Sequence, residues 1–308
     1  MRNRILLIAA VMAALAAIAP AGPITQIVAF GDSLSDNGRA LAAIGYPPAP
    51  YWNGRQSNGL VAVEYMAQRL GVPLTDLAWN GATTGAGNVD DGGTAKVRVL
   101  LPGMLAAMNQ DLADGKLPID PNAFYVIWGG PNDFLSITSP ADVAPTIVTA
   151  VTNLVTMAGT LEALGAQNIM VLGMPDLALT PRIQMADAMM PGTALLMHAA
   201  AMNFNAALAA SLPGGVRFFD TNAVYTDLYT NPTKYGLKNV TGFCFNGTTV
   251  CGDPQDFLFF DPSHPTTAAH AAFGKALADA AVPEPAAWSL TAIGFVSLAV
   301  AARRRVRG

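Results

Sequence analysis

Short, almost purely apolar runs alternate with longer segments of helical periodicity along most of this chain. The runs predict five β-strands, at residues 24–30, 74–78, 123–128, 168–172 and 216–219. Because these runs lack a polar face, we expect strands that are buried on both faces of a sheet. Two further apolar runs, one at each end of the chain, do not fit this alternation.

The segments between the predicted strands have the spacing of helices. Apolar residues recur every three or four positions from Ile147 to Leu161, and Gly165 follows as a possible C-cap. Further helices are predicted at residues 57–70, where Ser57 would be the cap, and at 192–210 and 266–281. Alternating strands and helices predict an α/β fold, a parallel sheet with helices on both faces.

The first terminal run has the pattern of an export signal. Arg2 and Arg4 give a positive start, residues 5–19 are apolar, and small residues end at Ala21. We therefore predict a signal peptide at residues 1–21 and a new N-terminus at Gly22. The alternative is an N-terminal membrane anchor, although the run is short for a membrane span.

The second terminal run, in residues 282–308, begins with Val282-Pro283-Glu284-Pro285 and ends in arginines. It resembles the PEP-CTERM sorting tail of exported bacterial proteins, which a membrane-embedded exosortase recognises. The apolar stretch 286–302 is just long enough to cross a bilayer, and the arginines would hold the C-terminus inside. We predict transient membrane association through this tail; the alternative is an ordinary tail anchor.

Residues 22–281 show no linker and no internal repeat, so they are predicted to form one domain. This part carries 11 basic and 20 acidic residues, a net charge of about −9. Such a charge disfavours nucleic acid and anionic membranes as partners.

Cys244 and Cys251 flank a loop-like segment, and in an exported chain they favour a disulfide over two free thiols.

Four short blocks, far apart in the sequence, carry the candidate chemistry: Gly31-Asp32-Ser33-Leu34, Asn80-Gly81-Ala82, Gly130-Pro131-Asn132-Asp133 and Asp261-Pro262-Ser263-His264. Ester hydrolysis needs a nucleophile, a base, a group that orients the base, and donors for an oxyanion. Ser33, His264 and Asp261 would supply the first three. The backbone N–H groups of Ser33 and Gly81 and the amide of Asn132 would form the oxyanion hole.

Two of the blocks also have a simpler interpretation. Ser33 could merely cap a helix, with Ser35 as a rival serine, and Asn-Gly at Gly81 could be a plain turn. Of the other histidines, His198 is expected to pack against the core or to lie on the surface, and His270 is expected to be structural.

The first three blocks each follow a predicted strand, and parallel strands bring such residues to one edge of a sheet.

Together the blocks resemble the GDSL family of lipases and esterases, also called SGNH hydrolases, from about residue 27 to about residue 280. Residues 231–241 are most similar to the secreted lecithinase/haemolysin branch. The resemblance implies a flavodoxin-like three-layer α/β/α sandwich with a mostly parallel five-stranded sheet. It also implies Ser33 as the nucleophile, since the family places it after Gly-Asp. No metal or organic cofactor is implied.

We therefore predict an exported serine hydrolase that cleaves short-chain acyl esters or lipids. Alternatives are a polysaccharide O-deacetylase or an acyltransferase with the same site, or a non-catalytic surface or matrix protein. The apolar segments 46–52 and 185–190, expected as loops, could line an acyl groove or be covered surface. Activity should fall as the pH drops through the pKa of His264, about 6.5 if unperturbed.

Overall fold

A computed structural model describes residues 23–90, 101–135, 137 and 139–282. The export signal predicted at 1–21 and the sorting tail from residue 283 onward, with its apolar segment 286–302, lie outside the described residues. Both remain predictions.

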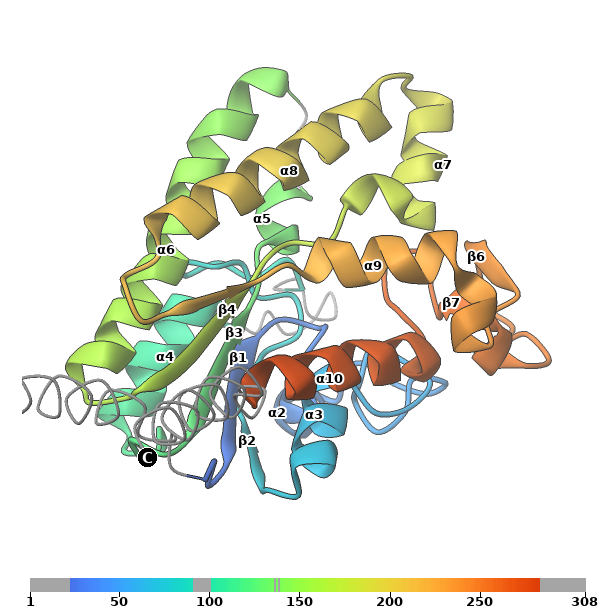
Figure 1. The fold of residues 1–308 in the computed structure, drawn as a ribbon. Coiled ribbons are helices and arrows are strands. Elements are labelled where there is room, and N and C mark those ends of the chain that lie inside the picture. Colours follow the sequence, from blue (N-terminus) through green and yellow to red (C-terminus); the bar gives the residue numbers. More distant parts are fainter. Residues whose placement is uncertain (1–22, 91–100, 136, 138, 283–308) are drawn as a thin grey trace, which may run out of the picture.

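Five parallel strands form the central sheet in the order β2-β1-β3-β4-β5, as Figure 1 shows. They are β1 (Ile27–Gly31), β2 (Leu74–Asp76), β3 (Phe124–Trp128), β4 (Asn168–Leu172) and β5 (Arg217–Phe219). The sequence prediction of this sheet is confirmed to within three residues at each end. Strands β1 and β3 are buried throughout and β4 is buried beyond Asn168, whereas the edge strands β2 and β5 are half-buried.

Helices cover both faces of the sheet (Figure 1). One face carries α4 (Met104–Ala113), α6 (Val143–Ala163) and α8 (Thr193–Ser211); the other carries α3 (Ala62–Leu70), α9 (Thr221–Thr230) and α10 (Thr267–Ala281). Shorter helices are α2 (Arg39–Ile44), α5 (Pro131–Phe134) and α7 (Pro181–Met189), and a separate pair of parallel strands comprises β6 (Asn239–Phe243) and β7 (Phe257–Phe259).

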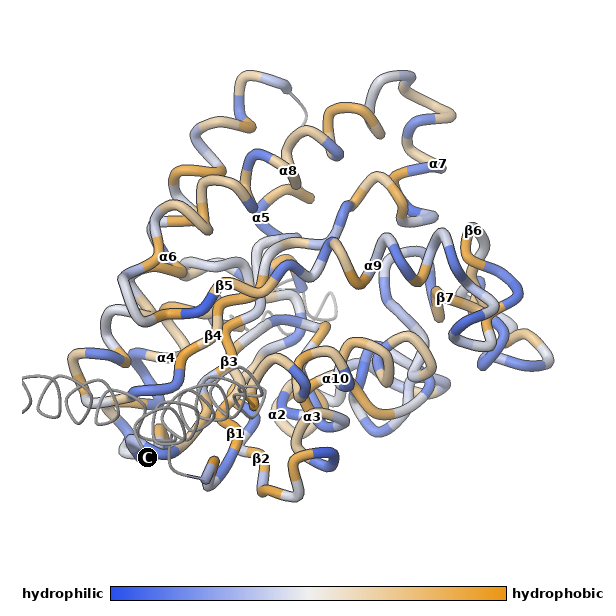
Figure 2. The backbone as a smooth tube through the Cα atoms, viewed as in Figure 1, coloured by the Kyte–Doolittle hydropathy of each residue, from blue (hydrophilic) through white to orange (hydrophobic). Residues whose placement is uncertain are grey.

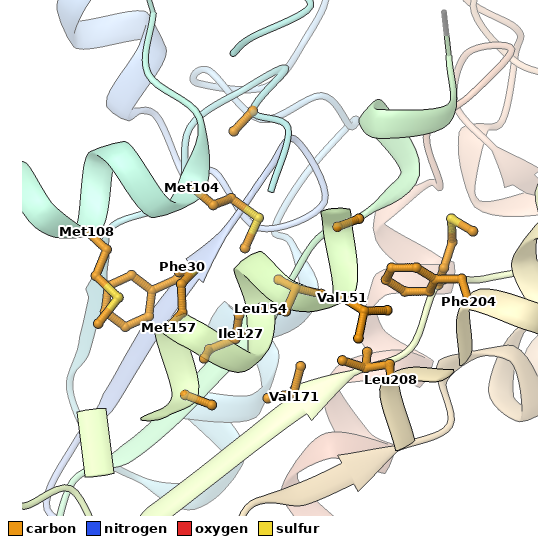
Figure 3. Packing of buried hydrophobic residues seen from close by; sticks show 14 of the residues in the cluster. Phe30, Met104, Met108, Ile127, Val151, Leu154, Met157, Val171, Phe204 and Leu208 are labelled. Atoms are coloured by element: carbon orange, nitrogen blue, oxygen red, sulfur yellow. The ribbon is translucent and has the colours of Figure 1, made fainter. Parts of the chain in front are cut away.

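The two faces of each central strand feed two separate cores, because successive side chains of a strand point to opposite sides. In β1, Val28 and Phe30 join the core under α4, α6 and α8, while Ile27 and Ala29 join the core under α3 and α10. Figure 3 shows Phe30 packed with Met108 and Met157 in the first core. Figure 2 accordingly shows mainly hydrophobic colours along the central strands β3 and β4, whereas β5 includes a hydrophilic stretch. Uninterrupted apolar runs are therefore explained by burial on both faces.

One helix, α6, belongs to a stretch that is long and apolar enough to cross a membrane, Pro140–Ala163. Seven of its side chains, from Ile147 to Leu161, are buried in the first core. Gly165 follows it with φ +101°, and its N–H donates to the Glu162 carbonyl as in a helix C-terminus. The apolar periodicity of this segment is thus that of a core helix.

Two local predictions are wrong. The helix expected at 57–70 begins only at Ala62, and Ser57 is not its cap, because the buried Ser57 hydroxyl donates to the Pro265 carbonyl. Glu64 accepts a hydrogen bond from the Val61 N–H at this helix start instead. The segment 185–190 is not a loop, since most of it lies in α7.

Candidate active site

The candidate site lies at the carboxyl ends of β1 and β3. The strand order runs from β1 outward to β2 on one side and from β3 outward to β4 and β5 on the other, so it reverses between β1 and β3. Open α/β sheets bind their ligands at such a switch point. Ser33 follows β1 and Asn132 follows β3. The prediction that the blocks meet at one edge of the sheet is confirmed.

Ser33 stands in a tight turn directly after β1. The N–H groups of Ser35 and Asp36 donate to the Asp32 carbonyl, and the Leu34 N–H donates to the Asp32 carboxylate. A Cβ on Gly31 would lie 2.8 Å from the Trp128 carbonyl oxygen, so only glycine fits there. The alternative that Ser33 merely caps a helix does not hold, because α2 begins only at Arg39. The turn itself, and not a helix start, presents the serine.

Ser33, His264 and Asp261 form a continuous hydrogen-bonded chain. The Ser33 Oγ lies 3.0 Å from Nε2 of His264, and Nδ1 of His264 lies 2.7 Å from Oδ2 of Asp261. Ser33 and Asp261 are 7 % and 5 % exposed. Nδ1 of His264 is thus held toward the Asp261 carboxylate, and Nε2 faces the Ser33 hydroxyl.

The loop after β7 is folded so that Asp261 and His264, three residues apart in the sequence, lie side by side. Oδ1 of Asp261 accepts hydrogen bonds from the backbone N–H groups of Ser263 and His264, both at 2.8 Å. The His264 carbonyl accepts from the Phe260 N–H, which ties the base of the loop. Thr266 then caps α10 through its hydroxyl. One carboxylate therefore shapes the loop and holds the imidazole.

Three donors converge beside Ser33. Within the described part of the chain, the backbone N–H groups of Ser33 and Gly81 donate to no other group. Asn132 directs its amide nitrogen to the Ala82 carbonyl at 2.9 Å, which uses one of its two N–H bonds. Asn132, Gly81 and Ser33 line the same cleft. The structure thus places the three predicted oxyanion-hole residues in one cleft, and their catalytic role stays a prediction.

Gly81 requires glycine for two reasons. Its φ is +72°, a conformation that side-chain-bearing residues rarely adopt. A Cβ there would also lie 2.4 Å from Oδ1 of Asn88 and 2.7 Å from Oδ2 of Asp90. The carboxylate of Asp90 therefore lies against the Gly81 backbone, beside the proposed oxyanion donor.

The other polar residues of the blocks support the loops. Asp133 accepts hydrogen bonds from the N–H and the hydroxyl of Thr84. Asp36 accepts from the N–H groups of Gly38, Arg39 and Ala40 and from that of Asn80. Asn80 is thereby anchored to the turn after β1.

Charges around His264 displace several pKa values. Burial alone would lower the pKa of His264, but the charge and hydrogen bond of Asp261 leave it above its ordinary value. Burial alone would raise the pKa of Asp261, yet the attraction of His264 leaves it below its usual range. Burial raises the pKa of Asp32 to about 7. An imidazole held against a carboxylate in this way is suited to accept a proton.

The remaining histidines lie outside this chain of hydrogen bonds. Burial lowers the pKa of His270, inside α10, to about 3, in keeping with a structural role. His198 is half-exposed, and its Nδ1 lies 2.6 Å from Oδ2 of Asp176. The prediction of a disulfide is confirmed, since Cys244 and Cys251 are bonded.

The residues converge on an open cleft of about 470 Å³. Its apolar lining includes Leu34, Leu135, Leu177, Ile183 and Phe245. Tyr46 and Tyr51 of the segment 46–52 also line it, whereas the segment 185–190 contributes no lining residue. Within the described ranges, His, Cys, Asp and Glu side chains nowhere form a group of three or more that could hold a metal ion.

The roles of three lining residues were not predicted by the sequence analysis: Tyr51, Asp90 and Arg182. The Tyr51 hydroxyl donates to Oδ2 of Asp261 at 2.7 Å, across 210 positions of sequence. Asp90 lies near both His264 and Arg182. No local pattern signals these roles, because each depends on which loops the fold brings together.

Comparison with known proteins finds several similar chains. The chain is similar to the phosphatidylcholine-sterol acyltransferase of Aeromonas hydrophila, at 26 % identity over 73 % of this chain and 67 % of that protein. It is similar to a GDSL esterase/lipase of Arabidopsis thaliana, also at 26 % identity, over 82 % of this chain and 88 % of that one. An extracellular lipase structure from Streptomyces rimosus matches 84 % of this chain and 100 % of its own, at 19 % identity and a TM-score of 0.46.

The strongest finding is at the level of the family. The model of the family described as GDSL-like Lipase/Acylhydrolase matches residues 27–277, which span the whole sheet and all four blocks. The chain belongs to the GDSL-like lipase and acylhydrolase family and is a carboxylic-ester hydrolase.

Proposed function

We propose that this protein is an exported serine esterase or lipase in which Ser33 is the nucleophile, His264 the base and Asp261 the group that orients the base. The observation that carries the proposal is the chain of hydrogen bonds from Ser33 Oγ through both ring nitrogens of His264 to Asp261. A histidine aligned in this way makes a serine hydroxyl nucleophilic.

The reaction proceeds in two halves. Nε2 of His264 takes the Ser33 proton as the serine oxygen attacks the ester carbonyl carbon. The N–H groups of Ser33 and Gly81 and the Asn132 amide donate to the oxygen that becomes negative. The carbonyl then reforms and the alcohol leaves with the proton from His264. In the second half His264 takes a proton from water as the water oxygen attacks the acyl-enzyme, and it returns the proton to the Ser33 oxygen as the carboxylic acid leaves.

The substrate is proposed to be a short-chain acyl ester or a lipid. The apolar side chains beside Ser33, such as Leu34 and Ile183, support an acyl group in the cleft. Acyl transfer is a second candidate, because one similar protein is named an acyltransferase. In that reaction an acceptor alcohol replaces water in the second half.

Export remains part of the proposal. The pattern of residues 1–21 supports a cleaved signal, and the disulfide between Cys244 and Cys251 suits an oxidising compartment. The tail that begins near Val282 would be recognised by an exosortase-type enzyme at the membrane, which places the mature domain outside the cell.

The test uses the full-length chain expressed with export. Hydrolysis of p-nitrophenyl esters from acetate to palmitate is measured for the wild type, Ser33→Ala and a control, Ser139→Ala, whose serine lies at an exposed turn. We expect the Ser33 variant to lose at least about 10³-fold in kcat and the control to match the wild type. Retained activity in Ser33→Ala, or none in a folded wild type, contradicts the proposal.

A further inference from the structure

Among the described residues that line the cleft, Arg182 is the one lysine or arginine. It is exposed to the cleft, and within the described part of the chain no side-chain hydrogen bond or ion pair engages it. All other described lysine and arginine side chains have such a partner; they are Arg39, Arg55, Arg69, Lys116, Arg217, Lys234, Lys238 and Lys275. The one unpaired cation of the described residues thus lies in the cleft that holds Ser33.

The backbone holds Arg182 close to the catalytic loop. Its N–H donates to the carbonyl of Pro262 at 2.8 Å, and Pro262 lies between Asp261 and His264 in the sequence. The next residue, Ile183, is buried and lines the same cleft. The guanidinium is therefore presented from a fixed peptide, with an apolar wall beside it.

The position of Arg182 in its own helix is unfavourable. It lies in the first turn of α7, where the positive end of the helix dipole disfavours a cation. That first turn has no acidic residue. The charge therefore has no stabilising role in the helix, and an anion in the cleft would be attracted by both the guanidinium and the helix end.

Asp90 does not neutralise Arg182 directly. Its carboxylate lines the same cleft, and the attraction of Arg182 opposes the rise that burial gives to the pKa of Asp90. The two groups form no ion pair within 4.0 Å among the described residues. The planar fork of the guanidinium consequently keeps its donors for a ligand, and that fork matches a carboxylate or a phosphate.

We propose that Arg182 is a specificity-determining residue that binds an anionic group, a phosphate or a carboxylate, carried by the ester substrate. The inference rests on the proposed hydrolase function and deepens it. The preferred substrate is then an anionic amphiphile, with its acyl chain among the apolar side chains of the cleft and its charged group on Arg182.

The test compares three esters with the same six-carbon acyl chain, which stay monomeric: 1-hexanoylglycerol, 1-hexanoylglycerol 3-phosphate and 3-O-hexanoylglycerate. For each, kcat and KM are measured with the wild type, Arg182→Gln, Arg182→Lys and Arg69→Gln. Arg69 pairs with Asp279 away from the cleft and serves as the matched control. The two anionic esters separate a phosphate preference from a carboxylate preference.

We expect Arg182→Gln to lower the ratio of kcat/KM for the anionic ester to that for the neutral ester by about tenfold, mainly through KM. The ratio for Arg182→Lys should lie between those of the wild type and Arg182→Gln, because lysine keeps the charge but not the planar fork. The ratio for Arg69→Gln should match the wild type. A ratio in Arg182→Gln within twofold of the wild type for both anionic esters overturns the inference.

Binding without turnover separates this inference from the proposed function. Calorimetric titration of Ser33→Ala with 1-hexanoylglycerol 3-phosphate and with 3-O-hexanoylglycerate is compared with the double variant that also carries Arg182→Gln. About tenfold weaker binding in the double variant supports the role of Arg182, even if the wild type hydrolyses none of the esters and the proposed function fails. Equal affinity, or no binding of either anion to Ser33→Ala, contradicts it.

Discussion

The Tyr51 hydroxyl donates a 2.7 Å hydrogen bond to Oδ2 of Asp261. The same oxygen lies 2.7 Å from Nδ1 of His264, so Tyr51 and His264 share one acceptor. Edge contacts with Phe245 and Phe260 hold the tyrosine ring in place. Tyr51 helps to keep the pKa of Asp261 below its usual range, so the carboxylate stays charged opposite the imidazole.

Tyr51→Phe should remove this hydrogen bond and retain the ring contacts. We expect kcat to fall by about three- to tenfold, because Asp261 is less firmly oriented, and the free energy of unfolding to fall by about 1 kcal/mol. Kinetics and urea unfolding of the two proteins measure both effects. An unchanged kcat would mean that Asp261 is oriented by Ser263 and His264 N–H groups alone.

Asn132→Ala tests the oxyanion donor. The amide is one of three donors beside Ser33, and its loss should reduce kcat by about 10²–10³-fold with little change in KM, since the charge develops only in the transition state. Asn231→Ala, at the exposed end of α9, is the control. A similar loss in both variants, or a change confined to KM, would rule out the role.

The pH profile should reflect the environment of His264. The imidazole must be neutral to accept the Ser33 proton, and the charges of Asp261, Asp32 and Asp90 raise its pKa. The acid limb of kcat/KM should therefore lie above pH 6.5, with activity lost as the pH falls through it. Asp90→Asn removes one of these charges, so its acid limb should move to lower pH.

The measurement is kcat/KM from pH 4 to 9 for the wild type and Asp90→Asn, with Asp187→Asn as the control. Asp187 accepts hydrogen bonds from backbone N–H groups at the α7–α8 connection. A limb in Asp90→Asn that stays in place, or moves upward, would contradict the electrostatic coupling of Asp90 to His264.

The disulfide between Cys244 and Cys251 should stabilise the wall of the cleft. It closes a short loop that contains Phe245, Asn246 and Gly247, all of which line the cleft. Loop-closure entropy gives about 2.5 kcal/mol for a ring of this length. The double variant Cys244→Ala/Cys251→Ala should have a free energy of unfolding lower by that amount, and therefore a lower denaturant midpoint, and it should show a raised KM. Equal unfolding midpoints would mean that the disulfide does not stabilise the protein.

The sequence alone determined the sheet and the four blocks of the site. Strands buried on both faces leave uninterrupted apolar runs, so their positions could be predicted to within three residues. Ser33, Gly81 and Asn132 follow strands, and parallel strands end at one edge, which places these residues together without knowledge of the packing. The spacing of Asp261 and His264 is local and is set within one loop.

Only the tertiary structure decided the start of α3, the helical state of 185–190 and the roles of Tyr51, Asp90 and Arg182. Ser57 resembles a helix cap, but its hydroxyl bonds to a carbonyl 208 positions away. Tyr51 reaches Asp261 across 210 positions. Such contacts depend on how the loops pack over the edge of the sheet, and no period or local spacing in the chain encodes that packing.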